Sequence, residues 1–79
     1  MIQVHNLNEV ISDNLKRVRT ESNLTQEQLA ERLDMGVDNY RGYWERGKKN
    51  IDIQDIILLA ASLKKNPVQM FEELTKGVF

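Results

Sequence analysis

The chain has 79 residues, 11 Lys and Arg against 12 Asp and Glu, and no cysteine. This length suits one domain over residues 1–79 with a modest core, and it excludes two lobes around a deep cleft. Without cysteine there is no disulfide and no thiolate metal site, and no apolar run is long enough to span a membrane. We therefore expect a soluble, cytoplasmic protein, whose net charge of −1 argues, over the whole chain, against a polyanionic partner.

Two amphipathic helices are expected in the first half of the chain. Apolar residues recur at three- and four-residue spacing from Leu7 to Val18, which predicts a helix that ends near residue 21. Thr25 stands where it caps a second helix, and Gln28 follows three residues later, where it closes a capping box. We expect that second helix to end at Gly36, in the left-handed conformation that glycine adopts at least cost.

A third helix follows, and its two sides differ in character. Val37, Tyr40 and Trp44 recur at helical spacing, so we expect them to face the core. The two aromatic side chains then anchor this helix to the rest of the domain. The other side presents four residues to solvent or to a ligand: Asp38, Asn39, Arg41 and Tyr43.

Two more helices complete the chain. Asp52 is placed to cap the fourth helix, and the fifth begins at Asn66 with Pro67 at its first position. The expected inward residues of the fourth helix are Ile53, Ile56, Leu59, Ala60 and Leu63, and those of the fifth are Val68, Phe71 and Leu74. Because no alternating strand pattern or repeat occurs, the expected fold class is all-α, a compact bundle of five short helices.

The residue types that usually carry catalysis are scattered along the chain. His5 is the only histidine and has no neighbour at metal-ligand spacing. Ser12, Ser22 and Ser62 lie outside any nucleophile motif, and the glycines form no phosphate-binding loop. We therefore expect no enzymatic activity, no metal, no cofactor and no small-molecule substrate.

Positive charge gathers in one short stretch, "RGYWERGKK", at residues 41–49. It contains four of the eleven Lys and Arg and a single acid, whereas residues 1–40 carry four basic and seven acidic side chains. A phosphate backbone senses local charge, because salt screens charges beyond about 8 Å. This stretch is therefore either a surface that binds nucleic acid or a solvated loop.

Five segments occur in an order and at spacings that resemble a known family. They read "LKRVR", "LTQEQLAERL", "YWERGKKN", "IQDIILLAASL" and "NPVQMFEEL". Together they resemble the phage-repressor and Cro-like helix-turn-helix family, of the xenobiotic-response-element type, over residues 15–74. The resemblance implies a lambda-repressor-like domain and a sequence-specific DNA-binding transcriptional regulator. The run "KNIDIQDIILLA" is similar to restriction–modification controller proteins, and a Cro-like repressor and an antitoxin remain alternatives.

The resemblance also implies roles for particular residues. Arg19 and Glu45 match a largely buried ion pair that holds the first helix of the family against the third. Thr25 and Gln26 match the start of the second helix, where the family meets a DNA phosphate. The third helix enters the major groove, which implies base contacts by Asp38, Asn39, Arg41 and Tyr43. The loop after it implies contacts to the DNA backbone by Arg46, Lys48, Lys49 and Asn50.

The third helix departs from the family pattern by one residue. Glu45 lies sixteen positions after Leu29, one more than is usual in the family. Either the turn at "DMGVD" is longer, or the helix contains a bulge near Gly42. We favour the longer turn, because Asp38 then caps the helix and the apolar residues keep one inward face. Arg41 is then free to reach a base, and it is the residue we most expect to do so.

The oligomeric state follows from the number of base contacts. A single domain of this size contacts few bases, so we expect a homodimer on a palindromic operator. Leu58 lies about 140° from Ile53 around the fourth helix, so it forms the dimer surface with Phe79 or is an isolated surface leucine. The alternative function is a protein–protein module on the same scaffold, an antitoxin or adaptor. An exposed apolar face on the fourth or fifth helix favours that alternative.

Overall fold

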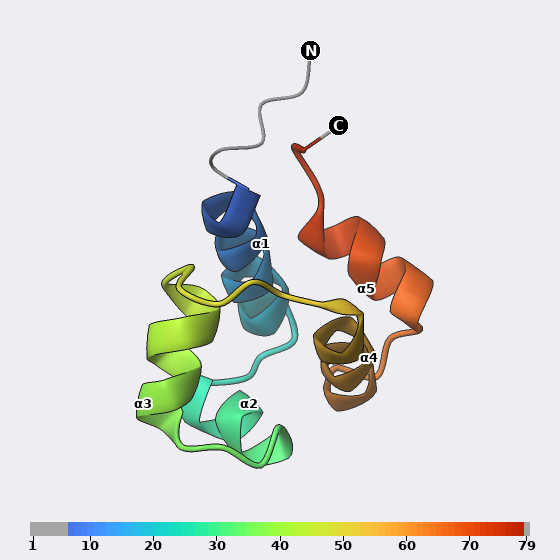
Figure 1. The fold of residues 1–79 in the computed structure, drawn as a ribbon. Coiled ribbons are helices and arrows are strands. Elements are labelled where there is room, and N and C mark those ends of the chain that lie inside the picture. The colour runs from blue at the N-terminus through green and yellow to red at the C-terminus, as the bar shows by residue number, and fades with distance from the viewer. Residues whose placement is uncertain (1–6, 79) are drawn as a thin grey trace.

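The computed structural model describes residues 7–78, and every regular element in that range is helical. The bounds are α1 Leu7–Glu21, α2 Gln26–Arg32, α3 Val37–Asn39, η1 Tyr40–Glu45, α4 Ile53–Ser62 and α5 Pro67–Leu74. The π-helical segment η1 continues α3 directly, so the two form one helix in space (Figure 1). The described part of the chain is therefore the all-α bundle of five helices that the sequence predicts.

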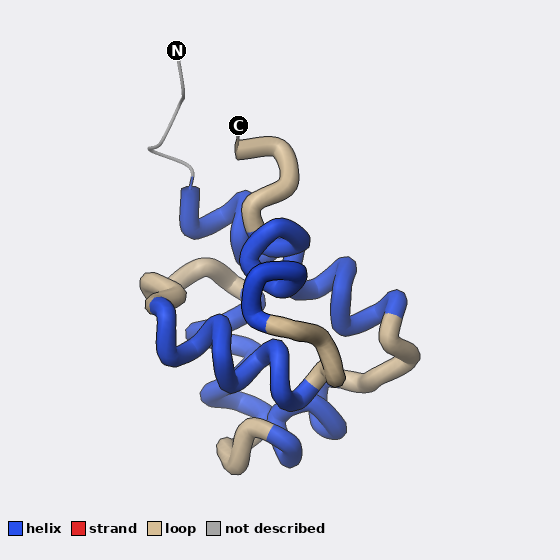
Figure 2. The backbone as a smooth tube through the Cα atoms, turned by 90° about the vertical axis from the view of Figure 1, so that its right-hand side faces the viewer, coloured by secondary structure: helices blue, strands red, loops and turns tan. Residues whose placement is uncertain are grey.

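The helices surround one apolar core. Helix α1 packs against η1 on one side and against α5 on the other, α4 packs against α5, and α2 lies against α3 (Figure 1). Short loops join them (Figure 2). The largest fully buried side chains are Leu15, Val18, Leu29, Tyr40, Leu59, Met70 and Leu74. None of the helices in residues 7–78 is long and apolar enough to cross a membrane.

Side-chain hydrogen bonds start three of the helices as predicted. The Gln28 backbone N–H donates to Thr25 Oγ1 at 3.1 Å, and the Thr25 N–H donates to Gln28 Oε1 at 2.8 Å, which is the expected capping box. Asp52 caps α4 by accepting from the Asp55 N–H at 2.9 Å. Asn66 caps α5 in the same way. These local bonds fix where α2, α4 and α5 begin.

The predicted inward faces of α4 and α5 are partly wrong. Ile53 is 76% exposed, Val68 is 68% exposed and Phe71 is 47% exposed. Ile53 and Val68 stand in the first turn of their helices, beyond the end of the core. Leu74 is buried as predicted, and Met70, one turn before it, forms the rest of the inward side of α5. The two helices therefore expose large apolar side chains that helical spacing alone placed in the core.

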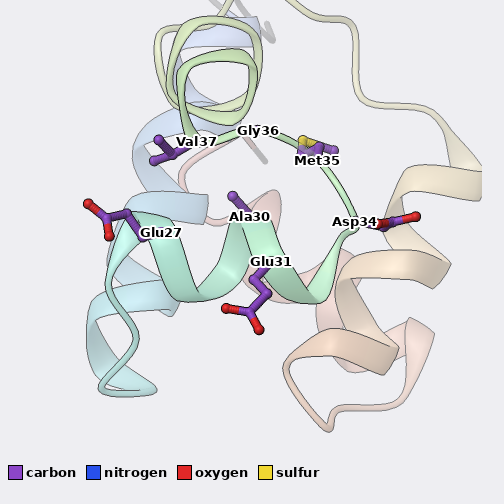
Figure 3. Close-up of a pocket in the computed structure, with 7 residues that line it drawn as sticks. All are labelled: Glu27, Ala30, Glu31, Asp34, Met35, Gly36 and Val37. Carbon is purple, nitrogen blue, oxygen red and sulfur yellow. The ribbon is translucent and has the colours of Figure 1, made fainter.

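The turn between α2 and α3 also differs from the prediction. Helix α2 ends at Arg32, and Asp34, not Gly36, adopts the left-handed conformation, with φ 57°. Aspartate tolerates this conformation because its short polar side chain can bond locally. Gly36 has φ −68° and is the residue that precedes α3. The hollow beside this turn is lined by Ala30, Met35, Gly36 and Val37 together with three acidic residues, Glu27, Glu31 and Asp34, whose carboxylates point outward in different directions (Figure 3).

Candidate nucleic-acid interface

The structure places Arg19 of α1 and Glu45 of η1 together. Arg19 Nε donates to Glu45 Oε2 at 2.6 Å, and Arg19 Nη2 donates to Glu45 Oε1 at 3.2 Å. A third guanidinium bond reaches the carbonyl of Leu24 at 2.7 Å. The side chains are 11% and 3% exposed, so this is a buried, bidentate ion pair. It holds the third helix against α1, as the family resemblance implies.

The Tyr40 hydroxyl donates a hydrogen bond to the same carboxylate. Burial alone would raise the pKa of Glu45, but the hydrogen bonds from Arg19, Tyr40 and Gln26 outweigh it and lower that pKa below its usual value. Burial, together with the bond to the Glu45 carboxylate, raises the pKa of Tyr40. Glu45 therefore stays ionised and Tyr40 stays protonated near neutral pH. The sequence identified Tyr40 as an apolar anchor and missed the role of its hydroxyl.

The π-helical segment allows the third helix to bury Tyr40 and Trp44 and also to turn Glu45 toward Arg19. Tyr40 and Trp44 both pack in the core, with ring centroids 6.3 Å apart, and Glu45 must face the same side to reach Arg19. In an α-helix of about 3.6 residues per turn, residues five apart point about 140° away from each other. A π-helix bonds residues five apart, so Tyr40, Trp44 and Glu45 share a face. The contact between Tyr40 and Glu45 depends on this geometry.

The extra residue of the third helix is absorbed within η1 and not in the turn before it, so the prediction of a longer turn is wrong. Asp38 does not cap the helix: α3 begins after Gly36 without a side-chain cap bond, and the Asp38 side chain is 95% exposed. Both ends of the helix are anchored, by Val37, which is partly buried against the core, and by Glu45 in the ion pair. The surplus residue is therefore taken up between them, in the π-helical segment that contains Gly42.

The four residues predicted to contact bases lie on the outer side of α3 and η1. Asp38 and Asn39 are exposed, and Tyr43 is 52% exposed. Arg41 is not free, contrary to the prediction. Its Nε donates to Gln26 Oε1 at 2.8 Å, and its Nη1 lies 3.4 Å from Asp38 Oδ1, with 39% of the side chain exposed. The reason is that Asp38, with no capping role, is available to pair with Arg41 one turn later.

Gln26 is the residue that joins the ion pair to Arg41. It is the first residue of α2, and its Nε2 donates to Glu45 Oε1 at 3.0 Å while its Oε1 accepts from Arg41. The family resemblance assigns Gln26 to a DNA phosphate. In this structure its amide instead bridges the buried carboxylate and the exposed guanidinium.

The loop after η1 divides into two free and two engaged side chains. Arg46 and Lys48 are exposed, and neither forms an ion pair with the residues described here. Lys49 Nζ lies 3.3 Å from Asp55 Oδ2 and 5.7 Å from the centre of the Trp44 ring. Lys49 therefore ties η1 to the start of α4.

Asn50 is engaged as well, because its Oδ1 accepts from Asn8 Nδ2 of α1 at 2.7 Å. Both partners, Asn8 and Asp55, were missed by sequence reasoning. The sequence gives a weak indication of the Asp55 contact: Asp55 lies three residues after the capping Asp52, a position from which its side chain turns back toward the loop. Nothing in the sequence pairs Asn8 with Asn50, which are 42 residues apart.

A capped α2, a tight turn and a third helix with a buried aromatic side and an exposed polar side define a helix-turn-helix DNA-binding domain. On this helix Asn39 and Tyr43 are exposed and line a hollow with Lys48 and Lys49 of the following loop, while Arg41 lies on the flank toward α2, where it bonds to Gln26.

Comparison with known proteins agrees with this class. The Helix-turn-helix family model matches residues 15–69, and the chain belongs to the helix-turn-helix family. The wild-type Restriction-Modification Controller Protein C.Esp1396I is 31% identical, with a TM-score of 0.72 over 89% of this chain and 88% of that chain. The nucleoprotein complex of C.Esp1396I is 30% identical, with a TM-score of 0.76 over 92% and 94%.

A more distant structure shows that the fold is shared beyond the controller proteins. The clp gene regulator ClgR from C. glutamicum is 20% identical, with a TM-score of 0.76 over 92% of this chain and 94% of that chain. No curated protein matches the sequence. The fold is thus that of helix-turn-helix transcription regulators.

Proposed function

We propose that this protein is a sequence-specific transcriptional regulator that places the outer side of α3 and η1 in the major groove of operator DNA. The observation that carries the proposal is the exposure of Asn39 and Tyr43, with Arg41 partly exposed beside them, on a helix that is buried through Tyr40 and Trp44. Asparagine pairs bidentately with adenine and arginine with guanine, so both side chains suit direct readout. Asp38, next to them, is a further candidate for a base contact.

The DNA backbone is held by the residues that flank this helix. Arg46 and Lys48 are exposed cations in the loop after η1, and Lys49 and Asn50 follow them. Thr25 and the main-chain N–H of Gln26 stand at the start of α2 and approach the backbone from the other side, while the Gln26 side chain is held by Glu45 and Arg41. These contacts supply position and affinity without sequence information. Binding to DNA of any sequence through these contacts stays weak, because the chain as a whole carries a net charge of −1.

The protein acts, in this proposal, as a homodimer on a palindromic operator in the cytoplasm. Helices α4 and α5 pack against each other and expose five large apolar side chains, Ile53, Ile57, Leu58, Val68 and Phe71. A second copy of the same face covers this surface and supplies the second reading helix, which a palindrome requires. Leu58 is 53% exposed and lies at the edge of this surface toward the third helix, where it lines a hollow with Tyr43 and Lys48. Phe79 lies outside the described residues.

The same apolar face supports a second candidate function. An exposed apolar surface on α4 and α5 is also what a protein–protein module, such as an antitoxin or adaptor, presents to its partner. The likeness to C.Esp1396I, a restriction–modification controller, favours regulation, and we propose that controller class for this chain. An activity as an enzyme has no support in the geometry of the described residues.

Selection from a pool of random duplexes tests the two functions. We expect the protein to enrich an inverted repeat, and sedimentation with the enriched duplex to give two protein chains per duplex. Enrichment of a single half-site with one chain bound would contradict the dimer. If no duplex is enriched although the protein is folded, the protein–protein function is the better description. An enriched site upstream of the protein's own gene would support the controller role.

A further inference from the structure

A continuous set of polar contacts runs from the core of the domain to its reading surface. Arg19 pairs with Glu45 at 2.6 Å, Glu45 accepts from Gln26 Nε2 at 3.0 Å, and Gln26 Oε1 accepts from Arg41 Nε at 2.8 Å. Three separate elements, α1, α2 and η1, contribute to it. The exposed fraction rises from 3% at Glu45 to 39% at Arg41, so the set begins in the core and ends in solvent.

The chemistry of the neighbours determines how the Gln26 amide is oriented. Ionised Glu45 only accepts hydrogen bonds and Arg41 only donates them. The amide satisfies both when its NH₂ faces Glu45 and its oxygen faces Arg41, and the opposite orientation satisfies neither. A glutamate at position 26 would place a second negative charge beside Glu45, and a lysine would offer no acceptor to Arg41. Glutamine is thus the residue type that links this anion to this cation.

The contacts also decide which part of the Arg41 guanidinium remains available. Arginine has five N–H donors, of which Nε–H is used by Gln26 and one Nη1–H is directed at Asp38. The donors left are the second Nη1–H and both Nη2–H groups, which form the outer end of the fork. This end matches the two acceptors, O6 and N7, that guanine presents in the major groove.

From this geometry we infer that Gln26 is a positioning residue, which holds Arg41 so that the outer end of its guanidinium reads one guanine in each half-site. The inference rests on the proposed DNA-binding function. An arginine held in place before binding loses less side-chain freedom when the complex forms. The Gln26 amide therefore raises affinity for the preferred base and has little effect on DNA that lacks it.

A phosphate contact by the same residue has a different signature. A phosphate contact is independent of sequence, so its loss weakens binding to every duplex alike and lowers the salt slope by about 0.9 per contact. A positioning role changes the base preference and leaves the slope as it was. The two roles are therefore distinguishable by measuring both quantities on one set of variants.

The test uses the inverted repeat that the wild-type protein selects, a copy with the Arg41-dependent base pair replaced, and a random duplex. We expect Gln26→Ala to lose roughly 2- to 12-fold in affinity per half-site for the selected repeat, the range that fixing one long side chain gives. Its affinity for the random duplex and its salt slope should stay at the wild-type values. The double variant Gln26→Ala, Arg41→Ala should be no weaker than Arg41→Ala alone, because Gln26 acts through Arg41.

Gln28→Ala is the matched control. It removes a glutamine from the same helix and one bond of the capping box, but Gln28 does not contact Arg41. We expect this variant to be less stable and to keep the wild-type base preference. A changed preference in Gln28→Ala would mean that loosening α2 is sufficient, and it would overturn the specific role of Gln26.

A second readout does not depend on DNA. In the free protein, the Nε–H resonance of Arg41 should exchange slowly with water in the wild type and quickly in Gln26→Ala, while the thermal midpoint confirms that the variant is folded. Equal losses on the selected and random duplexes with a lower salt slope would overturn the inference and assign Gln26 to a phosphate. If the wild type selects no duplex, the proposed function fails and this inference fails with it. Fast exchange of Arg41 Nε–H in the wild type would overturn the inference alone.

Discussion

Replacing Glu45 by Gln tests the buried ion pair with the least change in shape. Glu45 is 3% exposed and accepts from Arg19 twice, from Tyr40 and from Gln26, so the variant leaves the Arg19 cation, 11% exposed, without a charged partner. Breaking a buried pair in this way costs about 3–5 kcal/mol. A domain of this length is stable by about 4–12 kcal/mol, so the loss is a large share of the total.

Urea denaturation at pH 7 measures this loss directly. Trp44 is the only tryptophan and lies one residue before Glu45, so its fluorescence follows unfolding at the site in question. In a thermal scan the same loss corresponds to a fall of about 12–40 °C. The control is Glu73→Gln, which breaks a pair with Arg17 whose side chains are 24% and 33% exposed, and it should cost at most about 1 kcal/mol. A Glu45→Gln midpoint equal to that of the parent or of Glu73→Gln would refute the reasoning.

The pH dependence of stability supplies an independent check on Glu45. Its pKa is lower in the folded protein than in the unfolded chain, because its hydrogen bonds favour the ionised form against burial. Such a group stabilises the fold above its unfolded pKa of about 4.3, and this contribution is lost as pH falls through the folded pKa. We expect the parent to lose stability more steeply than Glu45→Gln below about pH 4.3. Parallel acid titration curves for the two proteins would contradict the assignment.

Three further predictions concern binding and assembly. Lys48→Ala should weaken binding to the selected and random duplexes alike and lower the salt slope by about 0.9, and Lys49→Ala should also lower the unfolding midpoint because it breaks the tie to α4. Unchanged slopes in both variants, measured by titration at several salt concentrations, would remove the loop from the interface. Arg41→Ala should cost about 1–3 kcal/mol on the selected duplex and relax one base pair per half-site; equal losses on both duplexes would indicate a phosphate contact. Leu58→Asp and Phe71→Asp should each shift sedimentation toward the monomer with the fold intact, since both side chains are about half exposed, and an unchanged dimer would exclude this face.

The positions of the helices follow from local sequence. Thr25 with Gln28, Asp52 and Asn66 are side chains that bond backbone N–H groups three residues away, and this interaction needs no other part of the chain. Apolar spacing likewise identified Leu59, Ala60 and Leu63 of α4 and Leu74 of α5 as inward residues, and all four are buried. The family resemblance, carried by these same segments, agrees with the match over residues 15–69.

Apolar spacing predicts the wrong buried residues where a helix extends past the core, and it cannot locate a change in the pitch of a helix. Ile53 and Val68 follow the inward pattern but stand in the first turn of their helices, and what covers a first turn depends on the neighbouring elements. The sequence shows that the third helix has a surplus residue, because Glu45 lies sixteen positions after Leu29. It does not show where the surplus residue lies, because a longer turn and a π-helical segment each add one residue to this stretch.

The starts of α2, α4 and α5 and much of the core were therefore predictable from the sequence alone, from capping side chains three residues away and from apolar spacing. Only the tertiary structure decided that the surplus lies in η1, since Val37 and the Arg19–Glu45 pair anchor the two ends of the helix from different elements. It also decided the partners of the polar side chains. Gln26 meets Glu45 and Arg41, 19 and 15 residues away, and Asn50 meets Asn8. Such contacts depend on how helices pack, which no local pattern encodes.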